Sequence, residues 1–114
     1  MARCMFCEIA AGDIPAKIVH ADEEAIAFRD IEPKAPTHVL VIPREHIATV
    51  NDLTGDHEPV VGRLFTIARQ VARDEGLADD GYRLVMNCGQ GAGQSVFHIH
   101  LHLLGGRHLS WPPG

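Results

Sequence analysis

Three histidines at alternate positions form the strongest chemical signal in the sequence. His98, His100 and His102 are separated by the apolar residues Ile99 and Leu101. Side chains alternate between the two faces of a β-strand, so a strand places the three imidazoles on one face, roughly 6.5–7 Å apart. On a helix each histidine would be turned by about 200° from the last, and the row would break up. The spacing therefore predicts a strand whose imidazoles work together.

Two kinds of chemistry suit such a row of imidazoles. Imidazole is a common zinc ligand, and two histidines on one strand face can chelate a metal. Alternatively, one imidazole attacks a phosphorus or acyl centre as a nucleophile while its neighbours tune it. A solvated strand face that is merely rich in histidine is a third interpretation, which the strict alternation with apolar residues disfavours.

A glycine-rich loop comes directly before the histidines. It contains Gly89, Gly91 and Gly93 and ends in Gln94 and Ser95. Glycines allow a tight backbone whose N–H groups can converge on an anion. The loop leads into a strand rather than a helix, so it is not a dinucleotide-binding motif. An anion cradle beside an imidazole nucleophile favours phosphoryl or nucleotidyl transfer over metal-dependent hydrolysis.

These groups must be positioned by strands and a helix. Apolar segments between Pro and Gly turns predict five strands: residues 17–20, 25–29, 38–42, 82–87 and 97–104. Spacings of three and four predict one long helix from about Asp56 to Glu75, capped by Thr54 or Asp56 and ended by Gly76. Its apolar stripe is Val60, Val61, Leu64, Phe65, Ala68, Val71 and Ala72. The order predicts an α+β fold, an antiparallel sheet of about five strands with the helix on one face.

The composition limits the classes to which the chain can belong. Its 114 residues suit a single domain over 1–114, and 46% hydrophobic with 22% charged residues is typical of a globular protein. A net charge of −5 provides no general electrostatic reason to bind nucleic acid, and no apolar run approaches the roughly 20 residues that cross a membrane. Three cysteines without a signal-peptide pattern favour a reducing, cytoplasmic location over a disulfide framework.

The histidine row and its surroundings resemble the histidine triad (HIT) superfamily, whose motif is His-φ-His-φ-His-φ-φ with φ apolar. Residues 98–104 match this motif at every position. The resemblance covers essentially the whole chain: residues 6–9, 12–15, 27–31, 33–43 and 93–97. The ending, residues 103–107 with Trp111-Pro112-Pro113-Gly114, is similar to the nucleotide-binding branch and unlike the dinucleoside polyphosphate hydrolase and galactose-1-phosphate uridylyltransferase branches. A HIT-like fold with a short N-terminal segment is implied.

The resemblance implies a purine nucleoside phosphoramidate hydrolase, which cleaves the P–N bond between a nucleoside 5′-monophosphate of the AMP or GMP type and an amine. His100 matches the nucleophile, which forms a nucleotidyl-histidine intermediate that water hydrolyses. The backbone carbonyl of His98 would fix the tautomer of His100. His102 and His38 match positions that bind phosphate oxygens, and Ser95 matches the group near the leaving amine. Such chemistry needs no metal cofactor.

The resemblance also implies a nucleotide pocket. Asp30 would bind both ribose hydroxyls, with Ile31 beside it as an apolar wall. Further matched positions line the purine pocket or the phosphate-side loop: Phe6, Ile9 and Phe28, then Asn87, Gly93 and Gln94. Each position has a simpler interpretation as well, with Phe28 and Ile31 as plain core and Asp30 as the cap of a turn.

Cys4 and Cys7 have the Cys-x-x-Cys spacing of metal ligands, although no second such pair accompanies them. Some bacterial histidine triad proteins carry this pair and complete a zinc site at positions that match His46 and His98. The resemblance thus implies a structural Cys2His2 zinc site that fastens the N-terminus to the sheet, with Cys88 outside it. The alternative is two reduced, partly buried thiols.

The resemblance further implies a homodimer in which the helix and the C-terminal residues meet across a two-fold axis. Trp111 would reach the partner's site, or else lie against its own surface. Two other functions remain open at this point: a metal-binding or metal-storage protein that uses the histidines with the cysteines, and a nucleotide-binding regulatory module with vestigial hydrolysis.

Overall fold

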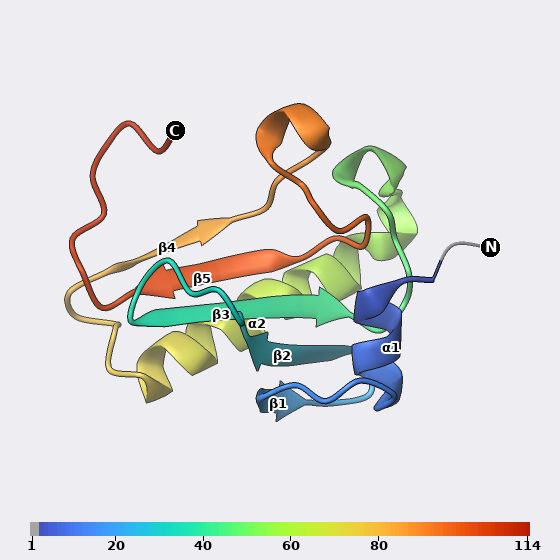
Figure 1. Ribbon diagram of the computed structural model, residues 1–114, viewed down its shortest axis with the longest axis horizontal. Helices are drawn as coiled ribbons and strands as arrows, with labels where there is room; N and C mark the ends of the chain where they lie inside the picture. The colour runs from blue at the N-terminus through green and yellow to red at the C-terminus, as the bar shows by residue number, and fades with distance from the viewer. Residues whose placement is uncertain (1–2) are drawn as a thin grey trace.

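The computed structural model describes residues 3–114, which form one sheet with helices packed against it (Figure 1). In chain order the elements are α1 (Met5–Ala11), β1 (Ile18–Ala21), β2 (Ala25–Arg29), β3 (Thr37–Pro43), η1 (Val50–Asp52), η2 (Gly55–His57), α2 (Glu58–Asp74), β4 (Tyr82–Val85), η3 (Gln90–Ala92) and β5 (Leu101–Gly105). The strands form one antiparallel sheet in the order β1-β2-β3-β5-β4. The predicted α+β fold, with about five strands and one long helix, is confirmed.

Each face of the sheet has its own core, because neighbouring side chains of a strand point to opposite faces. On β2, Ala25 and Ala27 pack with α2, whereas Ile26 and Phe28 pack with Phe6 of α1. Figure 1 shows α2 running behind the sheet and α1 crossing one end of it. Strand β3 is buried along its whole length between these layers, which explains its nearly continuous apolar run.

Helix α2 buries most of the predicted apolar stripe. Leu64, Ala68, Val71 and Ala72 are buried. Val60 and Val61 are partly buried, whereas 46% of Phe65 is exposed and Ile67, which was not predicted, is buried. The helix begins at Glu58 rather than at Asp56, because Thr54 caps the single-turn 3-10 helix η2 that precedes it.

The last strand is shorter than the predicted 97–104, since β5 begins only at Leu101. Of the three histidines, only His102 therefore lies in a strand. Pro43 ends β3 and has no N–H for the ladder, and its carbonyl accepts a hydrogen bond from the ring of His98 at 2.7 Å. Strand β4 likewise stops at Val85, which pairs with His102, short of the predicted residue 87.

The predicted alternation of side chains nevertheless continues through this irregular segment. Ile99, Leu101 and Leu103 are buried in the core beside α2. The rings of His98 and His100 contact Phe6 on the other face, with ring centroids 6.0 Å and 5.1 Å apart. The histidine row therefore faces α1.

The N-terminal segment, expected only as a short piece, forms helix α1. Cys4 caps its start, where its Sγ accepts the N–H of Cys7 at 3.4 Å, and Gly12 ends it at a φ of 83° that favours glycine. Arg44 donates a hydrogen bond to the carbonyl of Ala10 at 2.7 Å. Among residues 3–114 no helix is long and apolar enough to span a membrane.

Candidate functional site

A cavity of about 460 Å³ lies between α1 and the histidine row. Most of the predicted site residues line it: Phe6, Ile9, Phe28, Asp30, Ile31, His38, Ser95, His100 and His102. The prediction missed a further set of apolar lining residues: Met5, Ile14, Pro15, Ala16, Leu40 and Val96. These residues carry no chemical group that sequence reasoning could have singled out.

Three predicted nucleotide-binding residues do not line this cavity: Asn87, Gly93 and Gln94. Gln94 is only 3% exposed. Its Oε1 accepts the N–H of Gly89 at 2.8 Å, and its Nε2 donates to the carbonyls of Ala48 at 2.8 Å and Val96 at 3.1 Å. Both hydrogens of the amide are used, so this side chain holds the glycine-rich loop in place.

His100 has the protonation pattern that a nucleophile requires. Its Nδ1 lies 2.8 Å from the carbonyl oxygen of His98. A carbonyl only accepts, so Nδ1 carries the proton and the neutral ring keeps its lone pair on Nε2. The ring is buried against Phe6, and the residue lines the cavity.

His38 and His102 form a directed chain of hydrogen bonds. The backbone N–H of Lys34 donates to Nδ1 of His38 at 3.0 Å, so the proton of this ring lies on Nε2. That Nε2–H donates to Nδ1 of His102 at 2.9 Å, which leaves Nε2–H of His102 as a free donor. Burial lowers the pKa of His38, and burial with the neighbouring imidazoles of His100 and His38 lowers the pKa of His102 to about 4. Both rings are therefore neutral at neutral pH.

Asp30 serves a turn and faces the cavity at the same time. Its Oδ1 accepts the N–H of Glu32 at 2.8 Å, and its Oδ2 lies 3.5 Å from Nε2 of His38. A carboxylate offers further lone pairs, so the turn does not exhaust Asp30. Phe28 is buried and belongs to both core and cavity wall, whereas Ile31 is 93% exposed and is no core residue.

Asp30, His38 and His102 have donor atoms within 4.8 Å of one another, as a metal site would. The tautomers argue against this use. Nδ1 of His38 accepts from Lys34 and its Nε2 carries a proton, so the ring has no lone pair left for an ion. A metal site formed by Asp30, His38 and His102 is therefore unsupported, and with it the interpretation that the whole histidine row binds metal.

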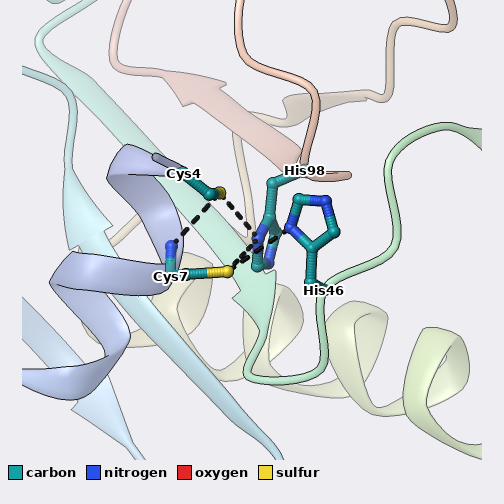
Figure 2. A group of neighbouring side chains, drawn as sticks. All are labelled: Cys4, Cys7, His46 and His98. Atoms are coloured by element: carbon teal, nitrogen blue, oxygen red, sulfur yellow. Dashed lines mark hydrogen bonds between the residues drawn. The ribbon is translucent and has the colours of Figure 1, made fainter. Parts of the chain in front are cut away.

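A second cluster does fit a metal (Figure 2). Ligand atoms of Cys4, Cys7, His46 and His98 lie within 4.8 Å of one another. Cys4 Sγ is 3.4 Å from Nδ1 of His98, and Cys7 Sγ is 3.4 Å from Nδ1 of His46 and 3.5 Å from that of His98. Usual zinc bond lengths in a tetrahedron put sulfur and nitrogen ligands about 3.6 Å apart.

The protonation of the cluster matters for this fit. His98 donates Nε2–H to the carbonyl of Pro43, so the lone pair of its Nδ1 faces the two sulfurs. Burial, the hydrogen bond with Cys4 and the charges of Cys4 and Glu8 raise the pKa of the Cys7 thiol to about 11. A divalent cation reverses such a shift, because it stabilises thiolates. Two sulfurs and two imidazoles are the donor set of a structural zinc site.

The five-stranded sheet, the long helix and the imidazole row define a histidine triad domain. The family model described as HIT domain matches residues 11–109, and the chain belongs to this family. The resemblance seen in the sequence is therefore confirmed.

Individual relatives agree with the family. The chain is 52% identical over 105 residues to the purine nucleoside phosphoramidase of Escherichia coli (strain K12), which covers 92% of this chain and 88% of that protein. A crystal structure of a HIT family hydrolase from Legionella pneumophila Philadelphia 1 matches with a TM-score of 0.97 and 54% identity, over 98% of this chain and 100% of that one. A HIT family hydrolase from Clostridium thermocellum matches with a TM-score of 0.93 and 45% identity, over 96% of each chain.

Proposed function

We propose that this protein hydrolyses purine nucleoside 5′-phosphoramidates to a nucleoside 5′-monophosphate and an amine. The observation that carries the proposal is His100, whose Nδ1–H is bonded to the carbonyl of His98 and whose Nε2 lone pair is free beside the cavity. At the level of class, similarity to proteins named phosphoramidase and hydrolase supports an enzyme of the HIT family that acts on nucleotides.

The reaction proceeds in two displacements. Nε2 of His100 attacks the α-phosphorus, and the P–N bond breaks with its electron pair going to the amine nitrogen. An amine leaves poorly unless it is protonated, and the hydroxyl of Ser95 lines the cavity where it can pass a proton to the nitrogen. Water then attacks the phosphorus of the nucleotidyl-histidine, and the bond from phosphorus to Nε2 breaks with its electron pair returning to the ring of His100. The proton that the water gives up restores the hydroxyl of Ser95, and the monophosphate leaves.

The remaining groups bind the nucleotide and stabilise its charge. The free Nε2–H of His102 donates to a phosphate oxygen, and His38 acts through His102 because its own N–H is engaged. Phe6, Ile9 and Phe28 form an apolar wall for the purine, and the carboxylate of Asp30 accepts the ribose hydroxyls. None of these roles needs a metal.

We also propose that Cys4, Cys7, His46 and His98 hold a structural zinc ion, on the strength of their donor set and mutual distances. Zinc bound there would link α1 to the segments that carry the two histidines. The free cysteines, including Cys88, suit a reducing compartment such as the cytoplasm.

A homodimer is the proposed assembly. Phe65 on α2 is 46% exposed, so a large apolar side chain of this helix faces outward. Trp111 is 80% exposed. Its ring stacks near the guanidinium of Arg83, 5.9 Å from the ring centroid, and Arg83 also donates to the carbonyl of Ser110 at 2.9 Å. The tail is thus held in a defined position from which Trp111 could reach a partner.

The test is the hydrolysis of adenosine 5′-phosphoramidate by the native protein and by His100→Ala, each with and without EDTA. Turnover by the native protein and a loss of about 10³-fold or more in the variant are expected. A collapse of kcat in EDTA with the fold intact would indicate a catalytic metal. AMP binding without any turnover would favour the regulatory module instead.

A further inference from the structure

Helix α1 belongs both to the metal cluster and to the cavity. Cys4 caps the helix and Cys7 lies in its first turns, while Phe6 and Ile9 of the same helix line the cavity. Cys4, Cys7 and His46 do not line the cavity themselves. Figure 2 shows the two cysteines at the N-terminal end of α1 facing histidines that come from separate, distant segments of the chain.

The helix depends on its attachments for its position. It spans only Met5–Ala11, far shorter than the roughly 12 residues at which isolated helices become even marginally stable. At its C-terminal end Arg44 ties the carbonyl of Ala10 to that of Asp22, at 2.7 Å each. At its N-terminal end the sulfurs of Cys4 and Cys7 reach across to His46 and His98. Thiol–imidazole contacts are weak, whereas metal–ligand bonds are strong and directional.

We propose that Cys4, Cys7 and His46 are positioning residues for the nucleotide. A metal ion bound by the cluster fixes the N-terminal end of α1, and α1 then presents Phe6 and Ile9 as the wall against which the base packs. That the ligand of the cavity is a nucleotide rests on the proposed function. Nucleotide affinity consequently depends on metal occupancy, although the metal takes no part in the reaction.

A second route from the metal to the chemistry would run through His98, whose carbonyl orients His100. That carbonyl is held without the metal. The ring of His98 donates to the carbonyl of Pro43 at 2.7 Å, and the N–H of Ile99 donates to the carbonyl of Ile47 at 2.8 Å. The nucleophile therefore keeps its partner when the metal leaves. Metal removal should raise KM and the Kd of AMP while kcat changes little.

Coupling between two binding sites is reciprocal, which makes it measurable from either side. Typical couplings change an affinity by about 5–150-fold. Isothermal titration of AMP into zinc-loaded and zinc-free native protein should give a Kd at least about fivefold weaker without zinc. Saturating AMP should raise the affinity for zinc, measured by competition with a chelating dye, by the same factor.

Matched variants separate the metal from the helix. His46→Ala removes an exposed ligand that is outside the cavity, and it should bind AMP as weakly as the zinc-free protein. Glu45→Gln changes its neighbour, which is no member of the cluster, and should match the native protein. Arg44→Ala loosens the other end of α1 without touching a ligand. It should weaken AMP binding in the zinc-loaded form and speed hydrogen exchange in α1.

The inference is overturned if AMP binds zinc-loaded and zinc-free protein within about twofold of each other, if kcat falls while KM stays, or if zinc does not bind. Turnover with equal KM in both forms would overturn this inference alone. Absence of both AMP binding and turnover in either form would overturn the proposed function with it. If zinc-free protein fails to fold by circular dichroism, Arg44→Ala in the zinc-loaded form tests whether the position of α1 sets the affinity for AMP, and native-like AMP binding by this variant overturns the inference.

Discussion

The carbonyl oxygen of His98 lies 2.8 Å from Nδ1 of His100, while the ring of His98 faces away from the reaction towards Cys4 and Cys7. One residue thus serves two sites, with its backbone in one and its imidazole in the other. The three histidines of the motif are not three equivalent catalytic groups. One is the candidate nucleophile, one a candidate phosphate donor, and one a candidate metal ligand.

This division predicts unequal effects of alanine substitution. His98→Ala keeps the backbone carbonyl that orients His100, so we expect activity to fall by about 10-fold, against about 10³-fold or more for His100→Ala. The variant leaves the buried carbonyl of Pro43 without its donor, which should cost about 1–3 kcal/mol of unfolding free energy. Steady-state kinetics and urea denaturation measure the two effects. Equal losses of activity in both variants would contradict the division.

Gln94 is predicted to hold the loop rather than to bind the phosphate. Gln94→Met fills the same space but removes the hydrogen bonds of the Gln94 side chain to the N–H of Gly89 and to the carbonyls of Ala48 and Val96. The melting temperature should therefore drop, and the free energy of unfolding should fall by about 1–3 kcal/mol. Gln90→Ala, an exposed position on the same loop, is the control and should change little. A variant of unchanged stability that has lost AMP affinity would instead make Gln94 a ligand.

The proposed dimer predicts an effect of a charge on α2. Phe65 is 46% exposed, and Phe65→Asp would place a charge in an apolar interface without disturbing the core beside Leu64. Light scattering coupled to gel filtration should find a dimer for the native protein and a monomer for the variant. Arg69→Asp, an exposed change on the same helix, provides the comparison. A native protein that elutes as a monomer at high concentration would rule out the assembly.

How far the sequence predicts this molecule depends on the kind of interaction involved. The hydrophobic period and the turn residues were enough to predict the approximate number of strands, helix α2 and strand β2, because local side-chain patterns determine these elements. The predicted alternation of Ile99, Leu101 and Leu103 with the histidines was also correct, because one face of this segment is buried in the core. The predicted start of β5 was wrong. The strand begins later because Pro43, which is remote in sequence, ends the neighbouring strand β3.

The site was predictable only through residues that carry chemistry. His100 and Asp30 stand out by type and spacing, whereas the apolar lining at Ile14, Ala16 and Leu40 does not. The difference between a cavity residue and a loop support such as Gln94 lies in tertiary hydrogen bonds, which no local pattern encodes. The spacing of the histidines also does not predict that the ring of His98 faces Cys4 and Cys7.

The tautomer chain predicts that His102 stays neutral well below the usual range of a histidine. Burial first, and then the neighbouring imidazoles, lower its pKa to about 4. NMR titration of its ring should find no change from pH 7 to about 5 and a transition near pH 4. The unfolded chain protonates it near pH 6.5, so its contribution to stability is complete above that pH and declines as the pH falls towards 4. Titration of His102 near pH 6.5 would contradict the buried, neutral state.

Acid should also weaken the corner where β1, β2 and α2 meet. Burial alone would raise the pKa of Asp22, but hydrogen bonds from His20, Arg63 and the backbone of Glu24 and Ala25 outweigh it and hold the pKa far below its usual range. A folded pKa below the unfolded one means that this carboxylate stabilises the fold above about pH 4 and that the benefit is lost as the pH falls further.

Asp22→Asn should therefore lower the free energy of unfolding by about 1–3 kcal/mol at pH 7. The difference from the native protein should shrink as the pH falls below about 4, where the native carboxylate begins to lose its advantage. Urea denaturation at several pH values measures it, with Glu23→Gln, an exposed neighbour in the same hairpin, as the control. A difference that stayed constant from pH 7 to the acid limit would show that the charge of Asp22 contributes nothing. The Arg63 contacts at 2.8 Å and 3.1 Å would then serve only to position the side chains.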